Sequence, residues 1–430
     1  MIFVKNYPAT YLLLFLLISL ANSLTLKKAQ EYLLARNLEK AAANMELCKK
    51  SYEEAEAKAI WYPSIDIVGS YNYFSEKNSV ALLGRKEVLG TNYRTEAGID
   101  ISWPITQAFV NIYNVRYRHF ALMAKEAQNK SLKNLLSFKL GTMFFLWNLS
   151  YNQLEVHNTL IEQLEDLLKQ TQNKYNAGFC SISKLLEVKA RVASAKTDLI
   201  SAKSLCDSIR FEIQNFLQCT DSSFIPEEYS FNLDSMQLAS LDTISINNTR
   251  AELTSLEYLE DQLKVFHKII SGQKYPSLVA YGGYRYANPG LNMGDSTFMG
   301  YAIAGIMLKW NIFDGFKVSS QHKQTKQQQE IIKIQKKQMI DSWNNAINNA
   351  KMQIKRAQSQ LDAAKTSCEA AEAVLTDAKN NFSSGTATQT DVLNALSARA
   401  MALLSVKKAE FMMNMAILQL YYASGKDIEF

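Results

Sequence analysis

The sequence predicts a mainly helical protein that carries a few membrane-type β-strands and is built from two copies of one unit. Three observations predict this class. Glycine and proline are scarce, at 16 and 6 in 430 residues, so helical segments can run long without a break. Segments of strand length alternate between apolar and polar residues. Motifs in the first half of the chain recur in the same order in the second half.

Composition excludes several classes of protein. Hydrophobic residues make up 47% and charged residues 20%, which is too apolar for a disordered chain and too charged for a polytopic helical membrane protein. The net charge is +6 without a block of Lys or Arg, so no nucleic-acid partner is expected. The Cys and His residues show no metal-site spacing, and no nucleotide-binding or hydrolase motif occurs. We therefore expect no enzyme, metal or cofactor.

Residues 1–23 have the organisation of a secretory signal peptide. Lys5 supplies the positive start, and the apolar run Tyr11–Leu20 is too short for a bilayer core that needs about 20 residues. Ala21 and Ser23 offer the small residues of a cleavage site. An uncleaved anchor is the alternative. Because no second long apolar run follows, the mature chain would have to enter a membrane as β-structure.

An internal repeat organises the rest of the chain. Tyr62-Pro63-Ser64 recurs as Tyr275-Pro276-Ser277. Further matches keep the same order in both copies: Gly69, Tyr71 and Tyr73 with Gly282, Tyr284 and Tyr286; Gly98, Trp103 and Phe109 with Gly305, Trp310 and Phe316; Asn173, Tyr175 and Gly178 with Asn380, Phe382 and Gly385.

Each unit has the expected order helix, strand, strand, long helix, helix. The first repeat covers 24–225 and the second repeat covers 249–424. A polar linker or equatorial segment, 226–248, lies between them, and a tail covers 425–430. Expected helices cover 26–61, 107–176, 181–219, 249–273, 316–384 and 386–423, and expected strands cover 64–74, 95–105, 277–287 and 298–312.

The two longest expected helices are too long for a compact domain. Residues 107–176 contain Gly141 but no proline, and 316–384 contain neither glycine nor proline. At 1.5 Å per residue each helix would run roughly 100 Å, so both need lateral partners along their length. Their seams are rich in Ala, Gln and Asn, which favours a side-by-side helical wall over a two-stranded coiled coil with regular leucines.

The expected strands have the pattern of membrane strands. Residues 65–73 alternate between an apolar and a polar set, and each segment is close to the 9–11 residues that cross a bilayer as a tilted strand. A soluble, half-buried sheet shows the same period and is the alternative. Aromatic residues stand at strand ends, where a girdle would meet the membrane surface: Trp103, Trp310, Tyr73 and Tyr286.

Four strands per chain cannot close a barrel, because bacterial single-chain barrels have at least about eight. An open sheet edge is not tolerated in lipid. We therefore expect a homotrimer, with a 12-stranded β-barrel that continues into a long α-helical barrel.

These features together resemble the TolC family of outer-membrane efflux proteins. The resemblance rests on the duplicated unit, the two Tyr-Pro-Ser boundaries, the junction Trp310–Gly315 and the two Gly-centred turns, and it covers nearly all of the mature chain. It implies a passive exit duct of a tripartite efflux or type I secretion system, in the outer membrane of a Gram-negative cell with a periplasmic helical portion. The implied partners are outer-membrane lipid, a periplasmic membrane-fusion adaptor and an inner-membrane RND or ABC transporter. The cargo, whether small molecules, metals or proteins, stays open.

The resemblance also implies site residues. The adaptor-docking tips of the family resemble Ala177-Gly178-Phe179 and Ser384-Gly385-Thr386. Phe382 and Ala387 stand where a Tyr and an Arg hold the entrance shut in one member of the family, so closure here needs other contacts.

An acidic ring at the tunnel entrance of the family corresponds to Asp391, and Asn394 stands where a second Asp is often found. Three copies of Asp391 would attract cations. An acidic residue in the first turn of a helix is the equally weighted alternative, and both roles can coexist.

A second reading of the chain is an exported structural or adhesive coiled-coil surface protein without pore activity. It predicts soluble strands and no conductance. Met412, Met413 and Met415 could suggest a path for a soft metal ion, but side-chain packing is the favoured interpretation.

Overall fold

The computed structural model describes residues 23–77, 79–82, 85–88, 91–219, 225–226, 230–231, 244–245, 250–292, 297–428 and 430. The expected signal peptide, apart from Ser23, and most of the expected linker 226–248 lie outside these residues. The chain forms two compact units. The helical unit contains Met1–Ala43, Asn129–Ala251 and Gln338–Phe430, and the sheet unit contains Asn44–Gln128 and Glu252–Lys337.

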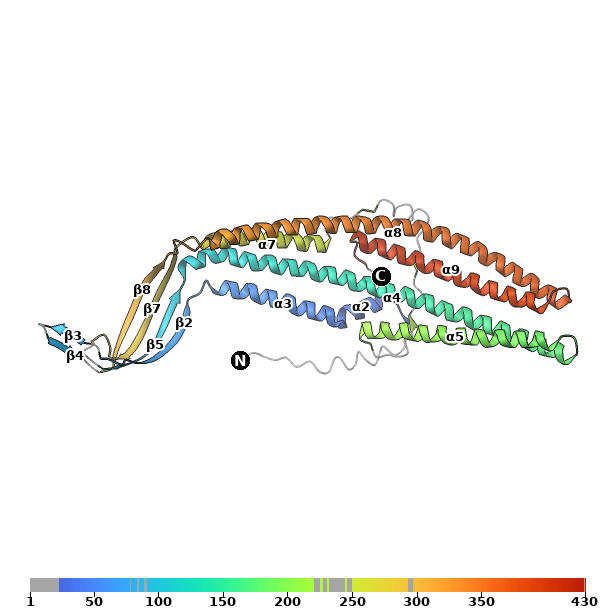
Figure 1. Ribbon diagram of the computed structural model, residues 1–430, viewed down its shortest axis with the longest axis horizontal. Coiled ribbons are helices and arrows are strands. Elements are labelled where there is room, and N and C mark those ends of the chain that lie inside the picture. The colour runs from blue at the N-terminus through green and yellow to red at the C-terminus, as the bar shows by residue number, and fades with distance from the viewer. Residues whose placement is uncertain are drawn as a thin grey trace. The chain divides into compact units, whose positions relative to one another are not determined.

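The order helix, strand, strand, long helix, helix occurs twice along the chain (Figure 1). The helices are α2 (Leu26–Arg36), α3 (Leu38–Ala59), α4 (Ile105–Asn176), α5 (Ile182–Leu217), α7 (Ala251–Gly272), α8 (Lys317–Ser384) and α9 (Gln389–Ser424). The strands are β1 (Ser23–Leu24), β2 (Ser64–Tyr73), β3 (Ser79–Leu82), β4 (Arg85–Val88), β5 (Tyr93–Trp103), β6 (Ile225–Pro226), β7 (Ser277–Asn288) and β8 (Met299–Lys309).

The expected single helix over 26–61 is wrong, because Asn37 divides it into α2 and α3. The backbone of Asn37 is extended, at φ −63° and ψ 126°, and its N–H donates to the Leu33 carbonyl at the end of α2. Its Oδ1 accepts from the Lys40 N–H at 3.0 Å and so caps the start of α3. Asparagine competes well for this capping role.

The expected set of four strands is incomplete. β3 and β4 pair antiparallel between β2 and β5 in the sequence, and the two-residue strands β1 and β6 pair parallel. Strands of two to four residues are too short to show a readable alternation, which explains why the sequence pattern misses them.

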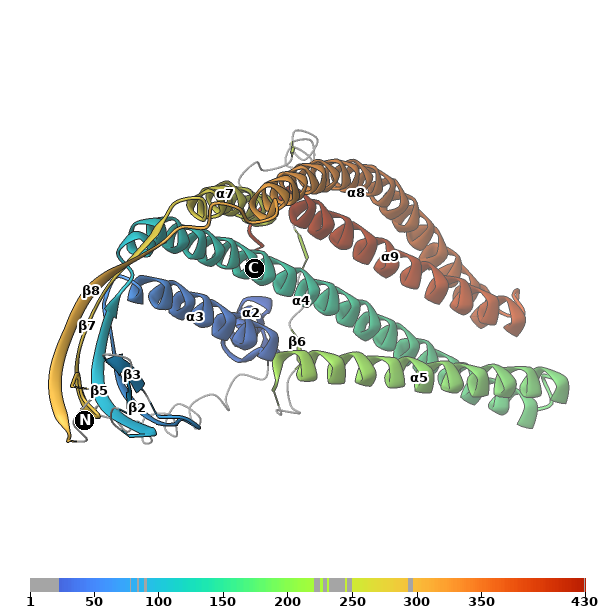
Figure 2. The same cartoon turned by 60° about the vertical axis from the view of Figure 1, so that its left-hand side comes forward.

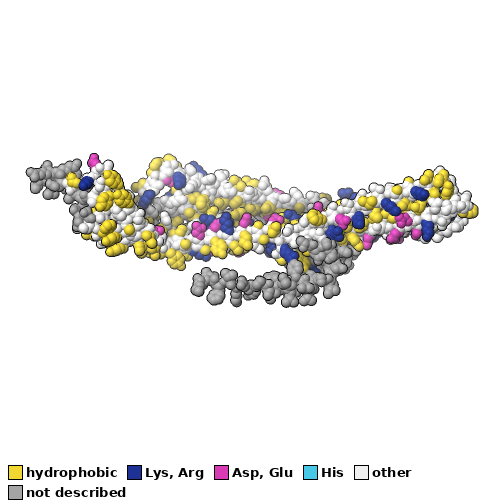
Figure 3. Space-filling model, turned by 90° about the horizontal axis from the view of Figure 1, so that it is seen from below, with side chains coloured by type: hydrophobic (Ala, Val, Ile, Leu, Met, Phe, Trp, Pro, Cys, Tyr) yellow, Lys and Arg dark blue, Asp and Glu magenta, His cyan; other side chains and the backbone are white. Residues whose placement is uncertain are grey.

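The main sheet is antiparallel with the strand order β2-β5-β7-β8, so the strands of the two repeats meet between β5 and β7 (Figure 2). In register, Ile67 pairs with Ile99, which pairs with Tyr284. One step along, Asp66 pairs with Asp100. Because paired residues share a face, the face with Ile67 is apolar. The opposite face, called the polar face below, carries the charged residues of β2, β5 and β7, together with Ile303 and Met307 of β8. Figure 3 shows hydrophobic side chains gathered over the strands.

Apolar clusters hold the helical unit together. The first joins α2, α4 and α5 through buried residues such as Leu33, Leu140 and Ile213. The second joins the facing ends of α4, α5, α8 and α9. A third joins α8 to α9, which run side by side in Figures 1 and 2. The helix ends that carry the two turns are therefore packed against one another rather than separate.

Candidate functional site

Two glycine-centred turns, between α4 and α5 and between α8 and α9, carry the residues expected to form the docking tips. Gly178 and Gly385 have φ of +79° and +81°, a region that favours glycine. After α4, the Phe179 N–H donates to the Lys174 carbonyl at 2.8 Å, and after α8, Thr386 N–H donates to the Asn381 carbonyl at 2.8 Å. These bonds satisfy the last carbonyls of each helix, as glycine-containing C-caps do.

Every expected tip residue is exposed, but the two tips differ in chemistry. In the first tip, Ala177 and Gly178 precede Phe179, whose side chain is 83% exposed. In the second tip, the hydroxyls of Ser384 and Thr386 both donate to the Asn381 carbonyl, at 3.1 and 3.0 Å. One tip therefore offers an aromatic ring and the other offers a small polar surface.

Hydrogen bonds between α5 and α9 tie the two turns into one block. Gln389 Nε2 donates to the Lys184 carbonyl at 2.9 Å, and Gln389 is itself buried. Further along the same two helices, Arg191 Nη2 on α5 donates to Ser397 Oγ on α9 at 2.6 Å. A buried cluster that includes Leu164, Val188 and Leu396 lies beneath these contacts.

Phe382 and Ala387, the positions expected near a closed entrance, make contacts unlike those of a Tyr and an Arg. The ammonium of Lys174 lies 3.6 Å from the centroid of the Phe382 ring, which links the end of α4 to the end of α8 by a cation–π contact. Ala387 contributes its backbone N–H to the Asn381 carbonyl at 3.0 Å. No sequence motif singles out Lys174 among the lysines of α4, so sequence analysis missed this contact.

Asp391 completes a capping box at the start of α9. Thr388 Oγ1 accepts from the Asp391 N–H at 3.3 Å, while Asp391 Oδ2 accepts from the Thr388 hydroxyl at 2.7 Å and from its N–H at 2.8 Å. The Thr388 hydroxyl first, and then its backbone N–H, hold the pKa of the Asp391 carboxyl below its usual value. Asn394 is exposed one turn further, on the same side of α9.

The four expected girdle residues are exposed and divide between the two ends of the main sheet. Trp103 ends β5 and Trp310 follows β8, both at the sheet end that is joined to helices. Tyr73 ends β2 and Tyr286 lies near the end of β7, toward the other end. Trp310 Nε1 donates to the Lys274 carbonyl at 3.1 Å, which orients its indole ring.

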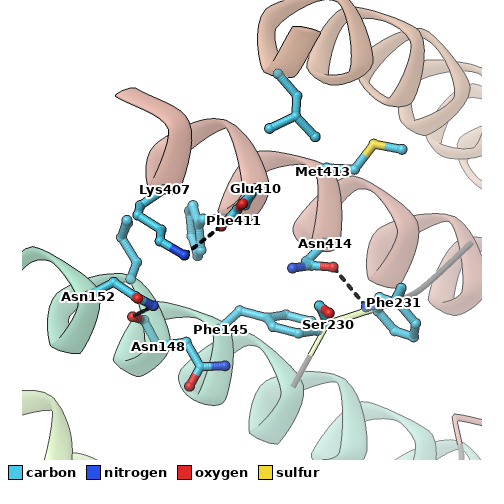
Figure 4. A pocket seen from close by; sticks show the side chains of 12 residues that line it. Phe145, Asn148, Asn152, Ser230, Phe231, Lys407, Glu410, Phe411, Met413 and Asn414 are labelled. Carbon is cyan, nitrogen blue, oxygen red and sulfur yellow. Dashed lines mark hydrogen bonds and ion pairs between the residues drawn. The ribbon is translucent and has the colours of Figure 1, made fainter. Parts of the chain in front are cut away.

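A cavity of about 400 Å³ in the helical unit lies between α4, α9 and the segment at Phe231 (Figure 4). Asn414 Oδ1 accepts from the Phe231 N–H at 3.0 Å, and Lys407 pairs with Glu410 at 3.2 Å. Met413 lies at its edge and packs against a core cluster. None of the expected site residues lines this cavity.

The described residues lack a metal cluster and a membrane-spanning helix. Among them, no cluster of three or more His, Cys, Asp or Glu has the arrangement to hold a metal ion. Within the same residues, no helix combines the length and apolar character needed to cross a bilayer.

Comparison with known proteins places the chain in a family. The model of the outer membrane efflux protein family matches residues 30–215 and 269–426. No protein of curated function matches. Among solved structures, the outer membrane protein VceC from Vibrio cholerae is 16% identical with a TM-score of 0.76, over 93% of this chain and 96% of that chain.

Two further structures share the fold. The CmeC outer membrane channel of Campylobacter jejuni is 15% identical with a TM-score of 0.76, over 94% of this chain and 86% of that chain. The open state of the MtrE outer membrane channel of Neisseria gonorrhoeae is 14% identical with a TM-score of 0.73, over 94% and 89%. The protein is therefore a TolC-like exit duct of the outer membrane with a periplasmic helical portion, and it is a transport channel rather than an enzyme. The chain belongs to the outer membrane efflux protein family.

Proposed function

We propose that three copies of the chain form one duct, in which their sheets join into a twelve-stranded β-barrel and their helices form the wall of a tunnel. The observation that carries this proposal is the pair of strands at the sheet edges. β2 and β8 have 10 and 11 residues, and each is paired with one neighbour in the sheet. Because unsatisfied backbone groups in lipid cost several kcal/mol each, such edges need partner strands.

Exposed apolar side chains on the helical unit support lateral partners for the helices as well. Ile200 and Phe211 on α5 are exposed and lie three turns apart, on one side of the helix. Met352 and Val374 on α8 are likewise exposed at a same-side spacing. Stripes of this kind mark interaction surfaces, and neighbouring copies of the chain would cover them.

The tips of the helical hairpins dock a periplasmic membrane-fusion adaptor, and an inner-membrane RND or ABC transporter supplies the energy. The support is the exposure of 177–179 and 384–386 on a rigid, packed base. The exposed ring of Phe179 offers an anchor for a pocket of the adaptor, because aromatic anchors contribute strongly at interfaces.

Asp391 from each copy forms an acidic ring that attracts cations at the periplasmic entrance. The hydrogen bonds from Thr388 lower the pKa of the Asp391 carboxyl and so favour its charged form. The entrance opens when the α8–α9 hairpin moves away from the α4–α5 hairpin. The links that then break are the Lys174–Phe382 contact and the bond from Gln389 to the Lys184 carbonyl. Adaptor binding biases this two-state movement.

The test is to extract the mature protein from outer membranes, measure its mass in detergent and add it to planar bilayers. We expect a trimer mass and discrete conductance steps. A monomer that gives no conductance at any concentration would contradict the duct and favour the reading as a structural coiled-coil surface protein. A trimer without conductance would contradict only the open passage.

A further inference from the structure

A cluster of charged side chains spans three neighbouring strands on the polar face of the main sheet. Arg285 on β7 binds two carboxylates of β5: Nη1 lies 2.5 Å from Glu96 Oε1, and Nη2 lies 2.5 Å from Asp100 Oδ2. Arg94 Nη2 lies 3.3 Å from Glu96 Oε2 and donates to the hydroxyl of Tyr301 on β8 at 3.2 Å. The Glu96 side chain is only 15% exposed.

The backbone is built to admit this arrangement. Arg285 is paired across the strands with Gly98, and its two carboxylate partners stand two residues to either side of that glycine. A Cβ on Gly98 would come within 2.9 Å of Arg285 Cδ and 2.5 Å of the Tyr284 carbonyl oxygen. A Cβ on Gly283 would come within 2.6 Å of Asp100 Oδ1. Glycines thus leave the space in which the guanidinium lies between two carboxylates.

The charges nearly balance at this level of the sheet. Arg94 and Arg285 stand against Glu96, Asp100 and Asp66, and Asp66 is the direct cross-strand partner of Asp100. One net negative charge per chain remains. Loss of the Arg285 charge would double that excess and would leave the Asp100 carboxylate without its guanidinium.

The cluster faces the water-filled passage if the duct is assembled as proposed above, and the inference rests on that assembly. The opposite face of the same sheet carries exposed apolar side chains, of which Ile67 on β2 is 87% exposed, and lipid is the solvent that fits them. The polar face must then line the lumen. Charges that line a water-filled passage act on permeating ions within about one Debye length, which is about 10 Å at 0.1 M salt.

We propose that Arg285 is a specificity-determining residue of the duct, which by binding Glu96 and Asp100 keeps the passage at the strands close to charge balance and open to cargo of either sign. The acidic ring at Asp391 then acts separately, so the duct carries two ionic filters of different strength. A purely structural cross-strand ion pair would stabilise the sheet without affecting ion preference.

The test is the reversal potential of single trimers in planar bilayers under a KCl gradient. Arg285→Gln keeps hydrogen-bond donors and removes the charge, and we expect the ratio of cation to anion permeability to rise about twofold or more at 0.1 M salt. The shift should shrink at 1 M, where the Debye length falls to about 3 Å. Arg285→Lys, which keeps the charge, should stay near the parent protein.

A charge-restoring pair separates charge from structure. Arg285→Gln combined with Asp100→Asn has the net charge of the parent protein, so the parent reversal potential should return. Asp100→Asn alone should move the preference toward anions. If Arg285→Gln fails to assemble, this isosteric change tests whether the charge balance of the cluster sets the ion preference. Conducting trimers whose reversal potential is the same in all these variants would overturn the role of Arg285. Absence of conductance in the parent protein would instead contradict the duct itself.

Discussion

Asp391, the residue proposed to form the acidic ring, also caps a helix. Its contacts with Thr388 complete the cap of α9, and the same carboxylate is exposed. A change to alanine would remove the cap and the charge at once, so it cannot separate the two roles.

The substitution Asp391→Asn separates the capping role from the charge, because the amide oxygen can still accept from the Thr388 N–H while the charge is lost. We expect weaker cation preference and weaker block by a trivalent cation, by about tenfold in the blocking concentration, since three charges leave one axis. Thr388→Ala is the control, as it weakens the cap and keeps the carboxylate. Block that is unaltered in Asp391→Asn, measured in planar bilayers, would show that the acidic ring is assigned to the wrong residue.

Within the sheet unit, α7 and the first part of α8 meet at a pair of histidines. His267 Nδ1 and His322 Nδ1 are 2.8 Å apart with stacked rings, and Ser271 Oγ lies 3.3 Å from His322 Nε2. All these contacts are satisfied when both rings are neutral. Burial first, then His267 and Lys274, lower the pKa of His322.

The lowered pKa predicts a stability that depends on pH. Unfolded His322 takes up a proton near its ordinary pKa of about 6.5, whereas the folded protein resists protonation until a lower pH. Folded stability should therefore be full above that pKa and fall as pH drops below it. We expect His322→Phe to lose less stability than the parent protein between about pH 7.5 and 5.5, measured by thermal unfolding in detergent. Equal losses in both proteins would contradict this account of the pair.

At the scale of elements, a single side chain can decide where a helix ends. Asn37 ends α2 and begins α3 in a stretch whose alanine-rich pattern suits one continuous helix. The cap competes with helix continuation locally, and the packing of α2 against α4 and α5 favours the break.

For the whole molecule, the decisive feature is a sheet with one apolar face and two edge strands. Membrane embedding requires that the apolar face meets lipid and that edges pair between copies. Ile67 lies in the middle of the edge strand β2, on the apolar face, and Ser70 lies on the polar face of the same strand.

A positive charge should hinder trimer assembly on the apolar face but not on the polar face. Ile67→Arg should sharply reduce trimers recovered from outer membranes, because an arginine at the centre of the bilayer costs about 2–4 kcal/mol. Ser70→Arg, the matched control, should assemble normally and can reach Glu96, its cross-strand partner. The measurement is the trimer fraction on semi-native gels. Equal assembly of both variants would contradict the orientation of the sheet.

The repeat and the order of its main elements can be predicted from sequence patterns alone. Scarce glycine and proline, the duplicated Tyr-Pro-Ser boundaries and alternating strands led to the TolC family, and the family match confirms that resemblance. The glycines at the two turns were also readable, since a positive φ demands glycine locally. A turn glycine and a strand's alternation depend on neighbouring residues, and a repeat is found by comparing two segments of the sequence, so none of these predictions needs a tertiary contact.

Contacts between side chains that are distant in the sequence become visible in the folded chain alone. Three contacts join residues from separate elements: Lys174 with Phe382, His267 with His322, and Arg285 with Glu96 and Asp100. No local pattern distinguishes these residues from others of their type. Their partners are set by helix packing and by the register between the strands of the two repeats. The physical reason is that period and propensity select an element and its face, whereas a contact across elements depends on how those faces are brought together.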